Sequence, residues 1–305
     1  MIATPIYHIT GMIALLGLFV YVGGTLWILN KVDPPRVLQY VKDYRLTFFH
    51  ASPAVFHLLL EERERFPRLP SLTRLACGSS NMPAGTIRKI KDWMPQAGFY
   101  TIYGMTEVSS PATTFPISAT ESPYIESSGV PIPGLDVKIV GEDGREVPNG
   151  EIGEITMYGT GVLEAYYNMD TGLITEDGWL KSNDLGYVND EGYLWIVDRK
   201  KDMINRGGEK ICAYDIENVL HQLPEIDEAV VVGIPDEKYG EVPAAAVRFE
   251  RSESLTEEEI TAYLRTQVAK YQIPVQFRFV EEIPRTINGK PDKKGVRALF
   301  IRRNE

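Results

Sequence analysis

The sequence contains one short segment in which an aromatic ring, a glycine, a hydroxyl and a carboxylate follow one another. Residues 100–107 read YTIYGMTE, and the apolar and aromatic residues at 99–103 predict a strand that ends at Tyr103. At the carboxyl end of a parallel strand, Tyr103 could stack on a flat base, and Gly104 would let the backbone approach a ligand closely. Thr106 could contact a phosphate, and Glu107 could hold Mg²⁺. The alternative is an ordinary strand-to-turn connection in which Thr106 caps a helix.

Two further charged residues could recognise a sugar. Asp184 lies in the segment 179–186 (WLKSNDLG), and Arg199 follows Asp198 at the end of a predicted strand pair. A carboxylate can accept the protons of two ribose hydroxyls, and a guanidinium can orient them. The alternative for Asp184 and Arg199 is a pair of surface turn residues or an ordinary ion pair.

A charged segment at 198–211 (DRKKDMINRGGEKI) contains a pair of glycines. Charges at a domain boundary stay solvated in either orientation of the domains, as a hinge requires. Gly207 and Gly208 permit positive φ and leave room for a ligand beside the backbone. A charge run by itself is typical of a solvated surface, but the glycine pair favours the functional interpretation.

The segment 283–294 (IPRTINGKPDKK) contains a tight-turn signal, Asn288-Gly289, directly before Lys290. The turn predicts that Lys290 lies at the tip of a loop and is displayed rather than packed. A displayed ammonium is suited to neutralising charge on a carboxylate and a phosphate while they react. The alternative is an ordinary exposed lysine.

The elements that must position these residues follow from the apolar pattern. Strand and helix patterns alternate over 33–117, which predicts a parallel sheet covered on both faces. After Gly129 the strands become short and the turns frequent, which is typical of antiparallel or barrel-like structure, and after Asp198 a compact α+β unit follows. The expected strands are 47–50, 72–77, 99–103, 136–140, 153–158, 192–197, 229–233, 245–249 and 276–279; the expected helices are 34–42, 53–62, one beginning at 83, 256–269 and 293–301.

Residues 12–29 are uncharged and strongly apolar, so a membrane span is an alternative for this stretch. Gly23-Gly24 divides it, however. The first part, 13–22, predicts a buried helix and the second, 25–29, a buried strand of a parallel sheet. We therefore expect no membrane span.

Composition narrows the functional classes. The chain has 305 residues, enough for two compact units, and its net charge of −10 with a pI near 5.1 argues against a nucleic-acid binder. The two cysteines, Cys77 and Cys212, lie far apart, which argues against a disulfide scaffold or zinc ribbon and makes a reducing cytoplasm the default location. The four histidines have no metal-ligand spacing.

Taken together, the four chemistry-bearing segments resemble, in order and approximate spacing, the adenylate-forming superfamily of acyl- and aryl-CoA synthetases, firefly-type luciferases and peptide-synthetase adenylation domains. Residues 5–11 (PIYHITG) look like the family's acyl-pocket motif. Residues 78–81 (GSSN) are similar to its pocket-floor loop, although commoner members carry Gly-Ala where this chain has Ser79-Ser80. The fold class that this implies is α/β: an incomplete large domain (1–198, with a β-rich subdomain at about 126–198) followed by a C-terminal lid domain (199–305), with a hinge near 199–202.

The resemblance implies a two-step reaction in which a carboxylate attacks the α-phosphate of ATP and a thiol, usually that of CoA, then displaces AMP. The family's Thr-Gly-Asp is here Ser182-Asn183-Asp184, which retains the aspartate. The implied roles are Tyr103 and Gly104 for adenine, Thr106 for phosphate, Glu107 for Mg²⁺, Asp184 and Arg199 for ribose, Lys290 for adenylation, Lys201 as hinge, Gly208 with Asn205 and Glu209 along the pantetheine tunnel, and His8, Gly78, Ser79 and Ser80 around the acyl and nucleotide pocket.

One family feature has no counterpart: no Ser/Thr/Gly-rich phosphate loop precedes Pro5. The expectation is an N-terminally shortened chain that lacks the phosphate-binding loop and is inactive by itself. It is explained by a truncated product, a split enzyme whose partner chain supplies the first half, or a fragment; a homodimer is a further option. The candidate pocket residues are apolar, which favours a fatty or aryl acid. Two alternatives stay open: an adenylation domain that loads a carrier protein, and a catalytically silent nucleotide-binding remnant.

Overall fold

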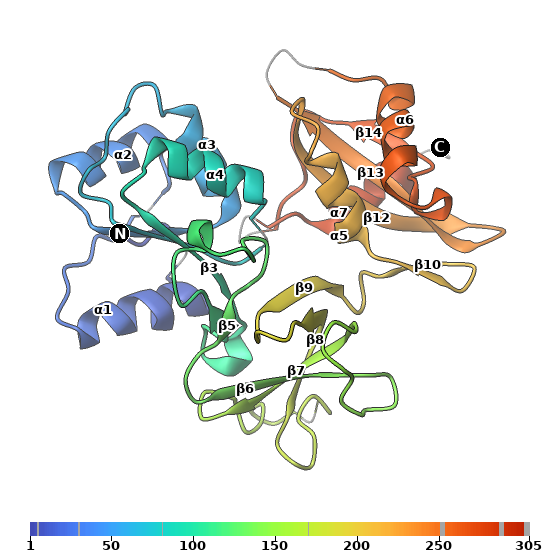
Figure 1. Ribbon diagram of the computed structural model, residues 1–305, viewed down its shortest axis with the longest axis horizontal. Helices are drawn as coiled ribbons and strands as arrows, with labels where there is room; N and C mark the ends of the chain where they lie inside the picture. Colours follow the sequence, from blue (N-terminus) through green and yellow to red (C-terminus); the bar gives the residue numbers. More distant parts are fainter. Residues whose placement is uncertain are drawn as a thin grey trace. The chain divides into compact units, whose positions relative to one another are not determined.

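The computed structural model describes residues 1–4, 6–29, 31–80, 82–169, 171–250, 254–286 and 290–301. The chain divides into two compact units (Figure 1). The first comprises residues 1–182 and 186–196, and the second comprises residues 183–185 and 197–305. The boundary therefore falls inside two neighbouring strands, β8 (Leu180–Val188) and β9 (Leu194–Arg199), rather than in a long linker.

The first unit contains a five-stranded sheet in the order β1-β2-β3-β4-β5. Three parallel strands form its main part, and two short antiparallel strands extend it: β1 (Phe48–Ala51), β2 (Arg74–Cys77), β3 (Gly98–Tyr103), β4 (Thr113–Thr114) and β5 (Val130–Pro131). Helices α2 (Pro34–Asp43), α3 (Pro53–Glu61) and α4 (Ala84–Trp93) connect them, with a 3-10 turn at Ala119–Glu121. The predicted parallel sheet is confirmed.

Sequence signals explain where these helices begin. Proline occupies the first turn of α2 and of α3, where its missing N–H has no intrahelical partner to lose. At α2 the Asp33 carboxylate also accepts a hydrogen bond from the Arg36 amide (3.1 Å). The helix starts read from Pro34, Pro53 and Pro83 are therefore correct to within one residue.

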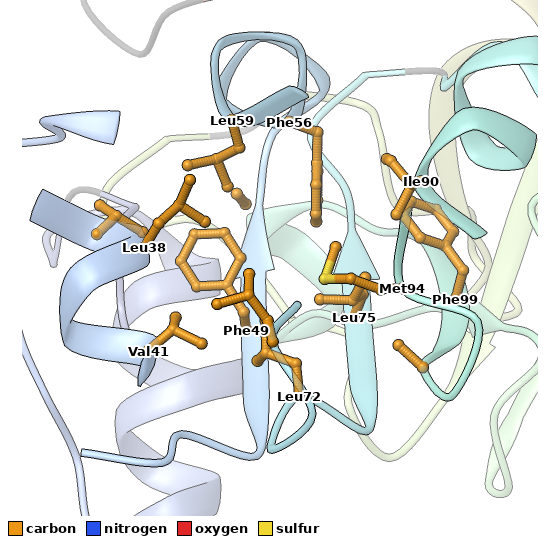
Figure 2. Packing of buried hydrophobic residues seen from close by; sticks show 14 of the residues in the cluster. Leu38, Val41, Phe49, Phe56, Leu59, Leu72, Leu75, Ile90, Met94 and Phe99 are labelled. Atoms are coloured by element: carbon orange, nitrogen blue, oxygen red, sulfur yellow. The ribbon is translucent and has the colours of Figure 1, made fainter. Parts of the chain in front are cut away.

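The main core of this unit lies between one face of the sheet and α2, α3 and α4. Phe49, Leu75 and Phe99 are in register on the three parallel strands, so their side chains project to the same face. Figure 2 shows them clustered with helix residues such as Phe56 and Ile90. The opposite face carries Phe48, whose ring packs against Phe19 of helix α1 (Leu18–Tyr21) at 5.2 Å between centroids.

The apolar stretch at 12–29 differs from expectation. A π-helix (Thr10–Gly17) continues into α1, so a helix does form, but Met12, Leu18, Val20 and Tyr21 are exposed and the prediction of a buried helix is wrong. The prediction of a strand at 25–29 is also wrong, because among the described residues only one backbone bridge, Ile2 to Ile28, forms there. Apolar residues lie on all sides of the helix, but the sheet covers only one side, so the apolar residues on the other sides stay exposed. Within the described ranges, no helix is both long and apolar enough to cross a membrane.

A second, four-stranded sheet has the order β6-β7-β8-β9, where β6 is Leu135–Val140 and β7 is Gly153–Gly159. Its core holds Leu135, Ile155, Leu180 and Leu194. Strand β8 was not predicted, because residues 180–188 mix polar and apolar types without clean alternation. Asn183 has φ 59°, a left-handed conformation that interrupts the period of two along this strand.

The second unit is an α+β fold around a sheet in the order β11-β10-β13-β12, with β14 pairing parallel to β13. The long strands are buried on both faces, under α5 and α6 on one side and α7 on the other. The strands are β10 (Ile204–Arg206), β11 (Glu209–Ile211), β12 (Ile226–Asp236), β13 (Gly240–Phe249) and β14 (Phe277–Phe279); the helices are α5 (Ala213–Leu220), α6 (Glu257–Gln267), a 3-10 turn (Lys270–Gln272) and α7 (Lys293–Ile301). The sequence did not predict α5, β10 and β11.

The core of the first unit generates a stability prediction. Phe56 is 1% exposed and contacts the rings of Phe49 and Phe99, so Phe56→Ala should destabilise the unit by about 3–5 kcal/mol through lost burial and the cavity left behind. Leu58, two residues away on α3, is 45% exposed, and Leu58→Ala is the matched control. Urea unfolding followed by circular dichroism measures both; equal loss in the two variants would contradict this account of the core.

Candidate functional site

The turn after β3 packs closely against the following loop. The Ala112 amide donates a hydrogen bond to the Tyr103 carbonyl (2.8 Å), which folds residues 104–111 back onto the strand end. A Cβ added at Gly104 would lie 3.0 Å from the Ala112 nitrogen and 3.1 Å from Ser110 Oγ. A larger residue would therefore push this loop away from β3, so the glycine at this position has a packing reason within the chain itself.

Glu107 lies in a 3-10 turn (Thr106–Val108) directly beyond this glycine. The Tyr166 hydroxyl donates a hydrogen bond to Glu107 Oε1 (2.6 Å), and the Leu163 amide donates to the Glu107 carbonyl (2.8 Å). The hydrogen bond to Glu107, with burial adding to it, raises the pKa of Tyr166 to about 12. Thr106 is exposed and makes no capping hydrogen bond, so the helix-cap alternative is wrong.

Tyr166 was not identified from the sequence. It lies 59 residues from Glu107 along the chain, in a segment of turns between β7 and β8. No local pattern links the two positions, because the contact exists only when the loop between them is folded.

The carboxyl ends of β1, β2 and β3 bring together three residues of one sheet face. A Cβ on Gly78, directly after β2, would lie 3.1 Å from the Ile102 carbonyl oxygen and 3.4 Å from His50 Nε2. His50 is 2% exposed. Beyond Gly78, Ser79 adopts a left-handed conformation (φ 78°) and Ser80 is exposed, while Asn81 and Pro5 lie outside the described residues.

His8 lies at the start of the π-helix. Its Nδ1 accepts a hydrogen bond from the Thr10 amide (3.3 Å). Burial lowers the pKa of His50 to about 4. A smaller hydrogen-bonding interaction with its own main chain raises this pKa, whereas the positive charges of His8 and the Met1 amino group lower it further. The predicted pocket histidine, His8, and the unpredicted His50 therefore act on one another electrostatically.

In the second unit, Asp184, Arg199 and Lys290 form one electrostatic group. Arg199 Nε lies 3.5 Å from Asp184 Oδ1, and the Asp184 side chain is the more buried of the two (14% against 52% exposed). Burial lowers the pKa of Lys290, Arg199 acts in the same direction, and Asp184 opposes them. Because Lys290 is half-buried, the expectation of a fully displayed lysine is wrong; Asn288 and Gly289 lie outside the described residues.

A buried charge network supports this group. Asp198 Oδ2 accepts a hydrogen bond from the Ala213 amide at the start of α5 (3.0 Å), and Asp198 Oδ1 accepts one from the Arg199 amide (2.7 Å). Lys293, at the start of α7, places its Nζ 3.6 Å from Asp198 Oδ1 and 4.0 Å from Glu217 Oε1. Burial disfavours the Lys293 ammonium, but these carboxylates outweigh it and raise its pKa. The network ties together the elements that carry Arg199 and Lys290.

The charged segment at 198–211 forms a turn and then a hairpin. Lys201 is exposed in the turn after β9, where the Asp202 amide donates to the Arg199 carbonyl (2.9 Å). In the β10–β11 hairpin, Gly207 (φ 61°) and Gly208 (φ 99°) occupy the turn. The Gly208 amide donates to Asn205 Oδ1 (3.0 Å), and Glu209 is exposed at the start of β11.

Two known protein families match this chain. The family described as AMP-binding enzyme matches residues 1–167, and the AMP-binding enzyme C-terminal domain matches residues 215–290. A feruloyl-CoA synthase from Amycolatopsis is 35% identical over 98% of this chain and 61% of its own length. An indoleacetate–CoA ligase from Aromatoleum aromaticum is 33% identical over 98% of this chain and 59% of its own.

Solved structures show the same fold. The o-succinylbenzoate CoA synthetase from Bacillus subtilis, in complex with its acyl-adenylate intermediate, has a TM-score of 0.85 at 30% identity and covers 97% of this chain and 60% of its own. ATP-bound MatB from Rhodopseudomonas palustris has a TM-score of 0.89 at 27% identity and covers 98% and 59%. The chain thus spans about three fifths of the length of the relatives that it matches.

The buried imidazole of His50 generates a pH prediction. Because its pKa is about 4 when folded and about 6.5 when unfolded, the folded state binds fewer protons between these values. Stability is therefore unaffected above about pH 7 and should fall by about 3 kcal/mol as the pH drops from about 6.5 to about 4. His50→Leu should remove this part of the acid sensitivity in urea titrations, whereas His57→Leu, on α3, should keep it. Parallel pH profiles for wild type and His50→Leu would contradict the prediction.

Proposed function

We propose that this chain, which belongs to the AMP-binding enzyme family, carries the nucleotide and acid sites of an ATP-dependent acid–CoA ligase. The observation that carries the proposal is the Tyr103–Glu107 turn, which presents an aromatic ring and an anchored carboxylate at the carboxyl end of a parallel strand. Relatives named as acid–CoA ligases support the reaction class.

In the proposed reaction, a carboxylate oxygen of the acid attacks the α-phosphorus of ATP, and the bond to the bridging oxygen of pyrophosphate breaks. The thiolate sulfur of CoA then attacks the acyl carbon, and AMP leaves with its phosphate oxygen. Tyr103 would stack on adenine and Thr106 would contact phosphate. Gly104, Gly78, Ser79 and Ser80 would form the surrounding wall, with His8 between the acyl pocket and the nucleotide.

The residues present suit a magnesium ion that is bound by the protein and by the substrate phosphates together. Among the described residues no cluster of three or more His, Cys, Asp or Glu could hold a metal by itself. Mg²⁺ is commonly held by one or two carboxylates together with substrate phosphates and water. Glu107 would supply that carboxylate, and Tyr166, which hydrogen-bonds one of its oxygens, would hold it in place. Bound there, Mg²⁺ would neutralise phosphate charge.

The second unit would supply the remaining contacts. Asp184 would accept the ribose hydroxyl protons beside Arg199, and the Lys290 ammonium would stabilise negative charge as the acid attacks phosphorus. The proposal places the domain boundary at 198/199 and the hinge at 199–202 with Lys201, which is supported by the exposure of that turn. Gly208, with Asn205 and Glu209, would line the path of the pantetheine arm; the positive φ of the glycine pair supports a backbone left open there.

The proposed acid is fatty or aryl, and the proposed thiol is CoA. The Ile102 side chain, whose Cβ would lie 3.7 Å from a Cβ on Gly78, is an apolar neighbour that supports an acid of this class. The exposed apolar side chains Met12, Leu18, Val20 and Tyr21 support a further element of the proposal, namely a polypeptide segment, from another chain or a second copy, that covers the face of α1.

Carboxylate-dependent ATP–pyrophosphate exchange tests the proposed reaction. Exchange is measured on the purified chain with a panel of fatty and aryl acids. Lys290→Ala should lower the exchange rate by about 10²–10³-fold with AMP affinity unchanged, because the ammonium acts on charge that develops during the reaction. Lys294→Ala, an exposed lysine on α7, is the matched control.

The outcomes separate the candidate functions. Exchange followed by transfer to CoA supports the ligase, whereas transfer only to a holo-carrier protein supports a carrier-loading domain. AMP binding by calorimetry without any exchange supports a silent nucleotide-binding protein. If AMP does not bind, the proposed nucleotide site is wrong.

The tie between Tyr166 and Glu107 generates a separate prediction. Tyr166→Phe removes the hydroxyl that orients the carboxylate, and it should weaken Mg²⁺-dependent ATP binding by about tenfold, as expected for a group that orients a metal ligand. Tyr167, the next residue, is 94% exposed, so Tyr167→Phe is the control. Calorimetric titration of ATP at several Mg²⁺ concentrations measures the effect, and identical Mg²⁺ dependence in the two variants would count against Glu107 as the ligand.

A further inference from the structure

One face of the parallel sheet gathers a small set of side chains at the strand ends. Ile2 forms a parallel backbone bridge with His50, and His50 is in register with Ala76, two residues before Gly78. Because side chains alternate along strands, His50 and Gly78 belong to the same face, opposite the core that contains Phe49. Thr4 lies in a bend two residues after Ile2. Ile102 joins them from β3, close to Gly78.

Two buried polar side chains, those of His50 and Thr4, have no hydrogen-bond partner among the described residues. His50 is 2% exposed, and neither of its ring nitrogens has a hydrogen-bond partner among the residues that the structure describes. The Thr4 hydroxyl is buried and likewise without a partner in that part of the chain. Buried polar groups are nearly always paired, because an unpaired one gives up its hydrogen bonds to water and gains none in return. Two such groups indicate a missing partner.

Gly78 lets the main chain after β2 approach the imidazole closely. A Cβ at this position would contact His50 Nε2 at 3.4 Å and the Ile102 carbonyl oxygen at 3.1 Å. The absence of a side chain therefore leaves no Cβ between Gly78 and the ring nitrogen, close to the carboxyl ends of the strands, where ligands of parallel sheets bind. A core position would be better filled by an apolar side chain of the same shape, since that would leave nothing unpaired.

We propose that His50 and Thr4 hydrogen-bond a hydroxyl group at the far end of the carboxylic acid substrate, which makes His50 a specificity-determining residue. The inference rests on the proposed function, because it assigns the acid pocket of that reaction. A neutral imidazole carries one donor and one acceptor, and a threonine hydroxyl can do either, so a hydroxyl matches both partners. A second carboxylate would offer only acceptors and an ammonium only donors. The lowered pKa of His50 keeps the ring neutral, consistent with an uncharged group.

Calorimetry with nonhydrolysable acyl-adenylate analogues tests the proposal. Two matched pairs serve as probes: benzoyl against ring-hydroxylated benzoyl, and butanoyl against 4-hydroxybutanoyl. The wild-type chain should bind the hydroxylated member of at least one pair about tenfold more tightly, because its counterpart leaves the buried groups unpaired. His50→Leu should abolish or reverse this preference, and His50→Asn, which retains a donor and an acceptor, should keep part of it.

AMP, which lacks the acyl group, distinguishes the possible failures. AMP affinity should be equal in the wild type, His50→Leu, His50→Asn and the control His57→Leu. Equal affinities within both probe pairs, or a preference that survives in His50→Leu, would overturn the role of His50 and leave the proposed function intact. Loss of AMP binding in both His50 variants would identify the imidazole as structural and also overturn the inference. Failure of the wild-type chain to bind AMP would instead overturn the proposed function, and this inference with it.

Discussion

Strands β1, β2 and β3 run parallel in register, and the alternation of their side chains separates two kinds of environment on one sheet. Odd-numbered positions on β1, such as Phe49, face α2 and α3 and build the core. Even-numbered positions, Phe48 and His50, face the opposite side, where Phe48 packs against Phe19 of α1. A one-residue slip in register would exchange these roles, so the hydrophobic core also fixes which residues line the site.

The second unit uses a different constraint. A partly buried lysine, Lys293, is held between the carboxylates of Asp198 and Glu217, and Asp198 is further held by the Ala213 amide. Breaking such a network leaves an uncompensated buried charge, which is far more destabilising than losing an exposed pair. Arg199 adjoins Asp198, and Lys290 lies three residues before Lys293. The network therefore restrains the main chain next to both charged groups of the site.

The sequence predicted regular structure well where one signal dominated. Proline at the helix starts and apolar runs in the strands located α2, α3 and the parallel sheet, because these signals are local. Strand β8 and the β10–β11 hairpin were missed because their residues are largely polar and are held by neighbouring strands rather than by propensity. The exposure of α1 was also missed, since uniform apolarity does not show how many sides of a helix are covered.

The residues of the site fall into the same two groups, those with a local sequence signal and those without one. Tyr103 to Glu107 is a contiguous motif, so its position at a strand end could be read directly. Tyr166 and His50 could not be identified, since Tyr166 acts across 59 residues and His50 stands out only because its ring has no partner among the described residues. The hydrogen bond from Tyr166 to Glu107 also couples the position of the carboxylate to the stability of the small sheet. The segment between them contains β6 and β7, so fraying of the small sheet would release the carboxylate. By linkage, any ligand that needs the held carboxylate must in turn stabilise a sheet that it never touches.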